Sequence, residues 1–168
     1  DLIWPLFVTA GEAGHSEPVA SLPGVSRWAI DGIVDRAREA IALGIPCIAL
    51  FPNTPPGLRS EDAAEAANPD NLVCRAIKAV RDACGSDIGI LTDVALDPYT
   101  SHGQDGFVDA HGYVSNDDTI AMLVDQARVQ AQAGADIVAP SDMMDGRVHA
   151  IRMGLEMEGH HNVQIIAY

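Results

Sequence analysis

The sequence contains a single lysine, Lys78, and few basic residues altogether. Its 10 lysine and arginine residues face 24 acidic residues, so that the formal net charge is −14 and the pI is near 4.5. Because nucleic acid phosphates are bound by clustered lysine and arginine, this balance argues against nucleic acid as a partner. It also argues against an anionic membrane surface, and no apolar run approaches the length of a membrane span.

Cysteine is equally scarce, with only Cys47, Cys74 and Cys84. An odd number without C-x-x-C spacing argues against a disulfide framework or a zinc ribbon, and it fits a reducing cytoplasm. Hydrophobic residues, in contrast, make up 48% of the 168 residues, enough for a real core. The chain starts at Asp1 without a methionine or a signal peptide and stops at Tyr168 within an apolar run. We therefore expect it to be a piece of a longer protein.

Short apolar runs alternate with stretches of helical periodicity along the whole chain. Strands are expected at 3–9, 47–51, 88–94, 137–139 and 163–167, helices at 30–41, 71–80, 115–131 and 148–155, and a small hairpin at 107–114. Apolar strands that alternate with helices predict a parallel sheet covered by helices, which is an α/β fold. An open doubly wound sheet and a (β/α)₈ TIM barrel both fit this pattern.

The barrel is favoured, because no G-x-G-x-x-G follows any strand and polar residues gather after the third and fourth strands. A whole barrel needs roughly 250 residues. We therefore expect residues 1–168 to form a single incomplete TIM-barrel domain that carries about the first four to five strands.

The densest group of functional side chains is the acid loop, residues 92–106, which reads TDVALDPYTSHGQDG. Asp93, at the strand end, could hold a substrate ammonium, while Asp97 and Asp105 could bind a hard cation such as Mg²⁺ or orient water. In the same loop, Tyr99 could support the site and His102 could carry a proton, although a structural hydrogen bond is the commoner role of such a histidine. Loop solvation and helix capping are the ordinary alternatives for all three aspartates.

A second polar turn follows the fourth strand and contains Ser141, Asp142 and Arg147. Ser141 could hydrogen-bond a substrate. Asp142 could support the site or cap the next helix, and Arg147 is expected to pair with an aspartate of this turn. Lys78 falls on an expected helix away from any strand end, so it is a poor candidate for Schiff-base chemistry.

Several segments, in order along the chain, resemble the porphobilinogen synthase (delta-aminolevulinic acid dehydratase) family. They are LIWPLFV, PGVSRW, ALGIPCIALFP, TDVALDPYTSHGQDG, NDDT and AGADIVAPSDMMDGR. The resemblance implies a TIM-barrel hydro-lyase that condenses two molecules of 5-aminolevulinate to porphobilinogen with loss of water, in tetrapyrrole (heme) biosynthesis. It also implies a homo-octamer, while the cytoplasmic location is expected from the cysteines.

The same resemblance implies roles for individual residues. Asp93 resembles the family aspartate that contacts the substrate amino group and aids proton transfer, and Ser141 resembles the serine beside it. Both Schiff-base lysines of the family would lie beyond Tyr168, so none is expected in this chain, and the fragment alone is expected to be inactive.

The acid loop departs from the zinc-dependent members of the family, which have three cysteines there. Those positions read Ala95, Asp97 and Asp105 in this chain, so we expect no zinc site. An activating Mg²⁺ with its main ligand beyond Tyr168, a monovalent cation, or no metal all remain compatible. Two other functions also stay open, namely another TIM-barrel aldolase or lyase with a divalent cation at the aspartates, and a non-catalytic half-barrel assembly module.

Overall fold

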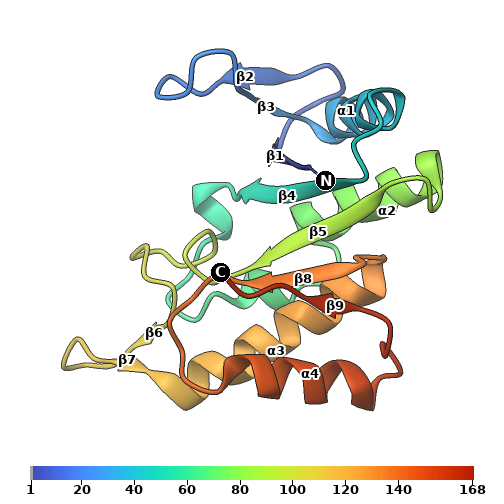
Figure 1. Cartoon of the computed structure of the whole chain (residues 1–168). Helices are drawn as coiled ribbons and strands as arrows, with labels where there is room; N and C mark the ends of the chain where they lie inside the picture. Colours follow the sequence, from blue (N-terminus) through green and yellow to red (C-terminus); the bar gives the residue numbers. More distant parts are fainter. Residues whose placement is uncertain (1) are drawn as a thin grey trace.

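The central feature of the computed structural model, which describes residues 2–168, is a seven-stranded sheet in the order β2-β3-β1-β4-β5-β8-β9 (Figure 1). At one edge lie β2 (Ser16–Pro18) and β3 (Ser26–Trp28), of which β3 runs parallel to its neighbour β1. The other five strands also run parallel and lie side by side in chain order. They are β1 (Ile3–Thr9), β4 (Cys47–Asn53), β5 (Gly89–Val94), β8 (Ile137–Pro140) and β9 (Gln164–Ile165). A doubly wound sheet reverses its strand order at a switch point. Among these five strands the order is unbroken, as in a barrel, and this agrees with the sequence prediction.

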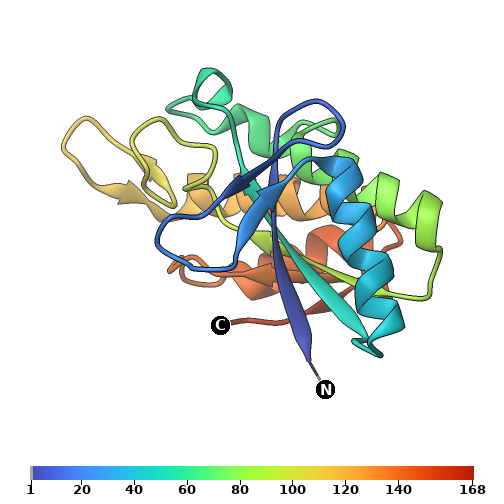
Figure 2. The same ribbon diagram turned by 90° about the horizontal axis from the view of Figure 1, so that it is seen from above.

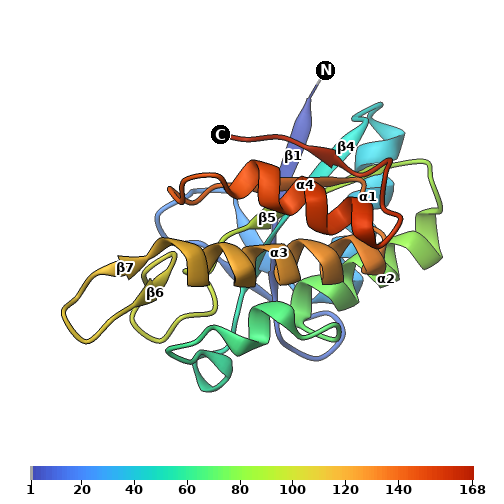
Figure 3. The same cartoon turned by 90° about the horizontal axis from the view of Figure 1, so that it is seen from below.

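The helices pack against one face of this sheet. They are α1 (Ile30–Ala42), α2 (Leu72–Cys84), α3 (Asn116–Ala133) and α4 (Arg147–Met157), with short 3₁₀ turns at Pro56–Leu58 and Ala64–Ala67. Figure 3 shows α2, α3 and α4 lying over the strands. Side chains alternate along each strand, so Ile48 and Leu50 join the core beneath the helices, while Cys47 and Ala49 join a cluster with Leu91 on the other face. That second face is the inner face of the barrel.

One feature differs from the sequence prediction and another agrees with it. No strand was predicted between residues 9 and 30, but Ser16–Pro18 (β2) pairs antiparallel with Ser26–Trp28 (β3), and β3 in turn extends the sheet beside β1. The predicted small hairpin is present as β6 (Phe107–Val108) and β7 (Val114–Ser115), and it projects from the body of the molecule (Figure 2).

Arg81 ties together the turns at the amino ends of β5 and β8. Its guanidinium donates to the carbonyls of Gly134 (2.8 Å), Gly85 (2.9 Å) and Ile88 (3.0 Å) and forms an ion pair with Asp136. Asp136 Oδ2 also accepts a hydrogen bond from the Ile90 backbone N–H at 2.8 Å. One side chain of α2 therefore satisfies carbonyls from two different turns, at the end of the sheet opposite to the acid loop.

We predict that Arg81→Met, made in the full-length protein, lowers the free energy of unfolding by about 2–4 kcal/mol, since several carbonyls and Asp136 lose their partner together. Turnover should change little, because barrel enzymes carry their chemistry at the other end of the strands. Thermal and denaturant unfolding measure the loss. Arg75→Met is the matched control, because Arg75 is exposed on the same helix. Equal stability of the two variants would contradict this role of Arg81.

Candidate active site at the carboxyl ends of β5 and β8

Asp93 lies near the carboxyl end of β5 and is directed to the inner face of the sheet. In the parallel register of β5 with β8, Asp93 stands opposite Ala139, while Thr92 stands opposite Val138. Ala139 belongs to the inner-face cluster and Val138 to the core under the helices. Because paired residues share a face, the Asp93 carboxyl points into the barrel and the Thr92 hydroxyl points towards α3.

Ser141 follows β8 directly and is brought beside Asp93. The Ser141 backbone N–H donates to the Val94 carbonyl at 3.3 Å, which continues the β5–β8 pairing by one step. Burial raises the pKa of Asp93 to about 6, while hydrogen bonding from Ser141 acts to lower it. Oδ1 of Asp93 is buried and has no hydrogen-bond partner among residues 2–168. A buried acceptor of this kind is suited to a donor from a ligand, such as an ammonium group.

Asp97 and Asp105 are the other two aspartates of the acid loop and influence each other's charge. Desolvation and the nearby Asp105 carboxylate raise the pKa of Asp97, against a smaller lowering by Arg59. Within the described part of the chain, no group of three or more histidine, cysteine, aspartate or glutamate side chains could hold a metal ion. Asp97 and Asp105 can thus contribute to a cation site only together with further ligands.

Asp142 is buried and organises the turn that carries Ser141. Its Oδ1 accepts a hydrogen bond from the Met144 backbone N–H at 2.7 Å, and its Oδ2 lies 3.1 Å from Nε of Arg147. Of the two roles considered for Asp142, capping of the next helix is not the one observed, because the N-cap of α4 is Gly146 and no side chain caps this helix. The carboxylate turns back to its own loop instead, and the expected aspartate pairing of Arg147 is present.

Neither Tyr99 nor His102 makes a hydrogen bond to the Asp93 carboxyl in the part of the chain that the structure describes. Tyr99 is fully buried in the core under α3, where burial raises its pKa far above the usual range of a phenol. His102 is exposed, and its Nδ1 accepts a hydrogen bond from the Gln104 backbone N–H at 3.1 Å. The phenol is therefore part of the packing behind the loop, and the imidazole closes a local turn on its outside.

Lys78, the single lysine, lies on the surface of α2. Its Nζ is 2.9 Å from Oδ1 of Asp70 and donates to the Pro69 carbonyl at 3.0 Å. An exposed, ion-paired amine of this kind lacks the desolvation that Schiff-base chemistry requires.

Sequence reasoning missed two glutamines of α3 and one aromatic residue near the site. Gln130 Nε2 donates to the carbonyl of Asp93 at 2.9 Å, and Gln126 Nε2 donates to that of Ala95 at 3.1 Å. Their spacing of four residues on the apolar face of a helix was the available signal. The third residue is Tyr168, where burial and the charge of Asp93 raise the pKa of the phenol.

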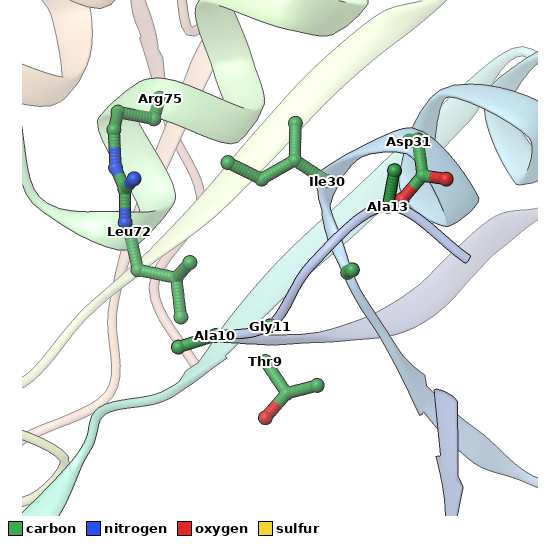
Figure 4. Close-up of a pocket in the computed structure, with 9 residues that line it drawn as sticks. Thr9, Ala10, Gly11, Ala13, Ile30, Asp31, Leu72 and Arg75 are labelled. Atoms are coloured by element: carbon green, nitrogen blue, oxygen red, sulfur yellow. The ribbon is translucent and has the colours of Figure 1, made fainter. Parts of the chain in front are cut away.

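A separate hollow of about 300 Å³ lies between the loop that follows β1 and the first turns of α1 and α2 (Figure 4). Arg75 and Leu72 line it from α2, and Ile30 and Asp31 line it from α1. None of the acid-loop residues contributes to it, so it is distinct from the site around Asp93.

Within residues 2–168, no helix is long and apolar enough to cross a membrane.

Comparison with known proteins gives a consistent result across the whole chain. The family model described as "Delta-aminolevulinic acid dehydratase" matches residues 1–168. The chain is 57% identical over 168 residues to delta-aminolevulinic acid dehydratase from Bradyrhizobium diazoefficiens, in a match that covers 100% of this chain and 47% of that protein. It is 48% identical over 170 residues to the chloroplastic enzyme of the same name from Physcomitrium patens, of which it covers 38%.

A solved structure agrees with the sequence comparisons. The crystal structure of delta-aminolevulinic acid dehydratase (porphobilinogen synthase) from Toxoplasma gondii ME49, in complex with the reaction product porphobilinogen, superposes with a TM-score of 0.94 at 48% identity. The match covers 99% of this chain and 47% of that chain. This chain thus spans less than half the length of these relatives, with the five parallel strands corresponding to the N-terminal part of their TIM barrel. The chain belongs to the delta-aminolevulinic acid dehydratase family.

Proposed function

We propose that these residues form the N-terminal half of a porphobilinogen synthase, whose full-length protein condenses two molecules of 5-aminolevulinate to porphobilinogen with loss of water. The observation that carries the proposal is the Asp93 carboxyl, placed on the inner face of the barrel beside Ser141, with a buried oxygen that lacks a partner among the described residues. The Toxoplasma gondii relative, which was solved with porphobilinogen, supports the same assignment.

The chemistry assigned to this site is binding of the substrate amino group and transfer of a proton to or from it. Asp93, with a pKa of about 6, exchanges a proton near neutral pH, as a general acid or base should. Its ionised form holds an ammonium group, while the Ser141 hydroxyl orients the carboxyl and the substrate nitrogen. The residues that form Schiff bases with the two substrates are assigned to the part of the barrel that follows Tyr168, since Lys78 is on the surface.

The site is proposed to work without zinc, either with a hard cation or with no metal. The side chain of Ala95 offers no ligand atom, and Asp97 and Asp105 offer carboxylate oxygen, a hard ligand that suits Mg²⁺, in place of the thiolates that suit zinc. An activating Mg²⁺ with its main ligand in the second half of the barrel, or a monovalent cation, fits these residues, and so does a reaction without metal.

Assembly and location follow from the family and from the cysteines. We assign a homo-octamer to the full-length protein on the family resemblance, which mass photometry tests directly. A reducing compartment such as the cytoplasm is proposed because Cys47, Cys74 and Cys84 are all free and buried.

We predict that Asp93→Asn in the full-length protein lowers kcat by about 10²–10⁴-fold, because the amide cannot exchange the proton.

The same substitution should stabilise the fold above pH 6. The folded carboxyl, with a pKa of about 6 against an ordinary value of 3.8, binds more protons than the unfolded one between these limits. Its stabilising contribution is therefore complete below pH 3.8 and is lost as the pH rises through 6.

Porphobilinogen formation and thermal midpoints measured from pH 4 to pH 8 check both effects. The gain in the free energy of unfolding should reach about 1–3 kcal/mol at the upper end and vanish at the lower end. Asp82→Asn, an exposed position on α2, is the matched control and should change neither quantity. A folded Asp93→Asn variant with full activity would remove Asp93 from the mechanism.

We further predict that the full-length protein keeps its activity when zinc is removed with a zinc-selective chelator. Of the three cysteine positions of the zinc-dependent members, one is Ala95 in this chain and the other two are the carboxylates Asp97 and Asp105. After complete removal of divalent ions, any activity that is lost should return with Mg²⁺. A loss that only zinc restores would contradict the assignment of the acid loop to a hard cation or to no cation.

A further inference from the structure

We propose that Gln130 and Gln126, named here the glutamine pair, are positioning residues that hold the carboxyl end of β5 and thereby set the place of the Asp93 carboxyl. The inference rests on the proposed function for its kinetic readout. It adds to the site two residues of α3 that touch neither the substrate nor the reacting atoms.

The carboxyl end of β5 needs such support because β4, one of its two neighbouring strands, is no longer hydrogen-bonded to it there. The pairing of β4 with β5 ends at Leu50–Thr92, whereas the pairing with β8 continues to Val94–Pro140. The carbonyls of Ile90 and Val94 face β8, since they accept from the backbone N–H groups of Asp136 and Ser141. Carbonyls alternate in direction along a strand, so those of Asp93 and Ala95 face the side where β4 is no longer paired.

Gln130 supplies the missing donor to the first of these carbonyls. Its Nε2 donates to the carbonyl of Asp93 at 2.9 Å, and its Oε1 accepts from the Thr92 hydroxyl at 2.9 Å. The residue is 0% exposed, so water does not compete for either bond. With both ends of the amide engaged, its orientation is fixed, and so is the peptide group that follows Asp93.

Gln126, one turn earlier on α3, serves the second carbonyl. Its Nε2 donates to the carbonyl of Ala95 at 3.1 Å, and the residue is 1% exposed. Oε1 of Gln126 is buried and has no hydrogen-bond partner among the described residues, so the amide of Gln126 is held at its nitrogen end only. The glutamine pair thus replaces β4 as the hydrogen-bonding neighbour of β5.

The consequence for chemistry follows from the alternation of side chains. The Asp93 carboxyl points to the inner face, whereas the backbone carbonyl of Asp93 accepts a hydrogen bond from the Gln130 amide in the helix layer. If this hydrogen bond is removed, the buried carbonyl must find another partner, and the peptide group rotates with it. Rotation moves the carboxyl away from Ser141, and a displacement of about 1 Å is enough to cost on the order of 10²-fold in rate.

The decisive variant is Gln130→Met in the full-length protein, because methionine keeps the length of the side chain and removes the amide. We expect kcat to fall by about 10-fold or more, with KM changed by less than about 3-fold. The fall of kcat on the acidic side of its pH profile, named here the acid limb, should move to higher pH. The reason is that the influence of Ser141, which lowers the pKa of Asp93, is weakened, so that Asp93 ionises at a higher pH. A residue that acted only on stability would leave this limb in place.

Gln132→Met is the matched control, since Gln132 is exposed on the same helix and should leave kcat and the pH profile unchanged. If Gln130→Met does not fold, the double variant Thr92→Val/Gln130→Met decides the question, because it also removes the hydroxyl left without its partner. A folded variant with unaltered kcat and an unaltered acid limb would overturn the proposal.

The proposed function and the glutamine pair can fail separately. If the unsubstituted full-length protein forms no porphobilinogen, the proposed function is wrong, and the pair is then tested by crystal structures alone. A shift of the Asp93 carboxyl relative to Ser141 in Gln130→Met, and none in Gln132→Met, supports the positioning role. An unmoved carboxyl in Gln130→Met overturns it.

Discussion

The parallel pairing of β5 with β8 is the constraint on which the site depends. Its register sets Asp93 opposite Ala139 and carries on through the bond from the Ser141 N–H to the Val94 carbonyl. A shift of one residue would turn Asp93 into the layer beneath the helices and Thr92 into the barrel. The apolar residues of these strands fix the register, because Val94 and Val138 have to face the core under α3 and α4.

The same arrangement places a carboxyl where its ionisation is disfavoured. Burial is the largest influence on Asp93, and the carboxylates of Asp97 and Asp142 act in the same direction. Such a group weakens the fold near neutral pH while it acquires a pKa useful for proton transfer. Two neighbours limit the rise in the pKa of Asp93. Arg147 forms an ion pair with Asp142, and the Ser141 hydroxyl favours the ionised form of Asp93.

Much of this was open to prediction from the sequence, for identifiable reasons. Apolar strands alternating with periodic helices specify a parallel sheet, and the carboxyl ends of neighbouring strands meet, so Asp93 and Ser141 could be expected together. The β2–β3 hairpin was missed because Ser16–Pro18 is short and polar, without the alternation that marks a strand. The roles of Gln126 and Gln130 were missed because a partner on another element decides whether a polar residue on a helix is buried.

The spacing of Gln126 and Gln130 has a consequence for how the length of the chain can vary. Each residue added to or removed from an α-helix rotates the rest of that helix by about 100°. An insertion or deletion between these two positions would leave only one amide facing β5, so this turn of α3 should not tolerate a change in length. The tip of the β6–β7 hairpin projects into solvent and is under no such restriction (Figure 1).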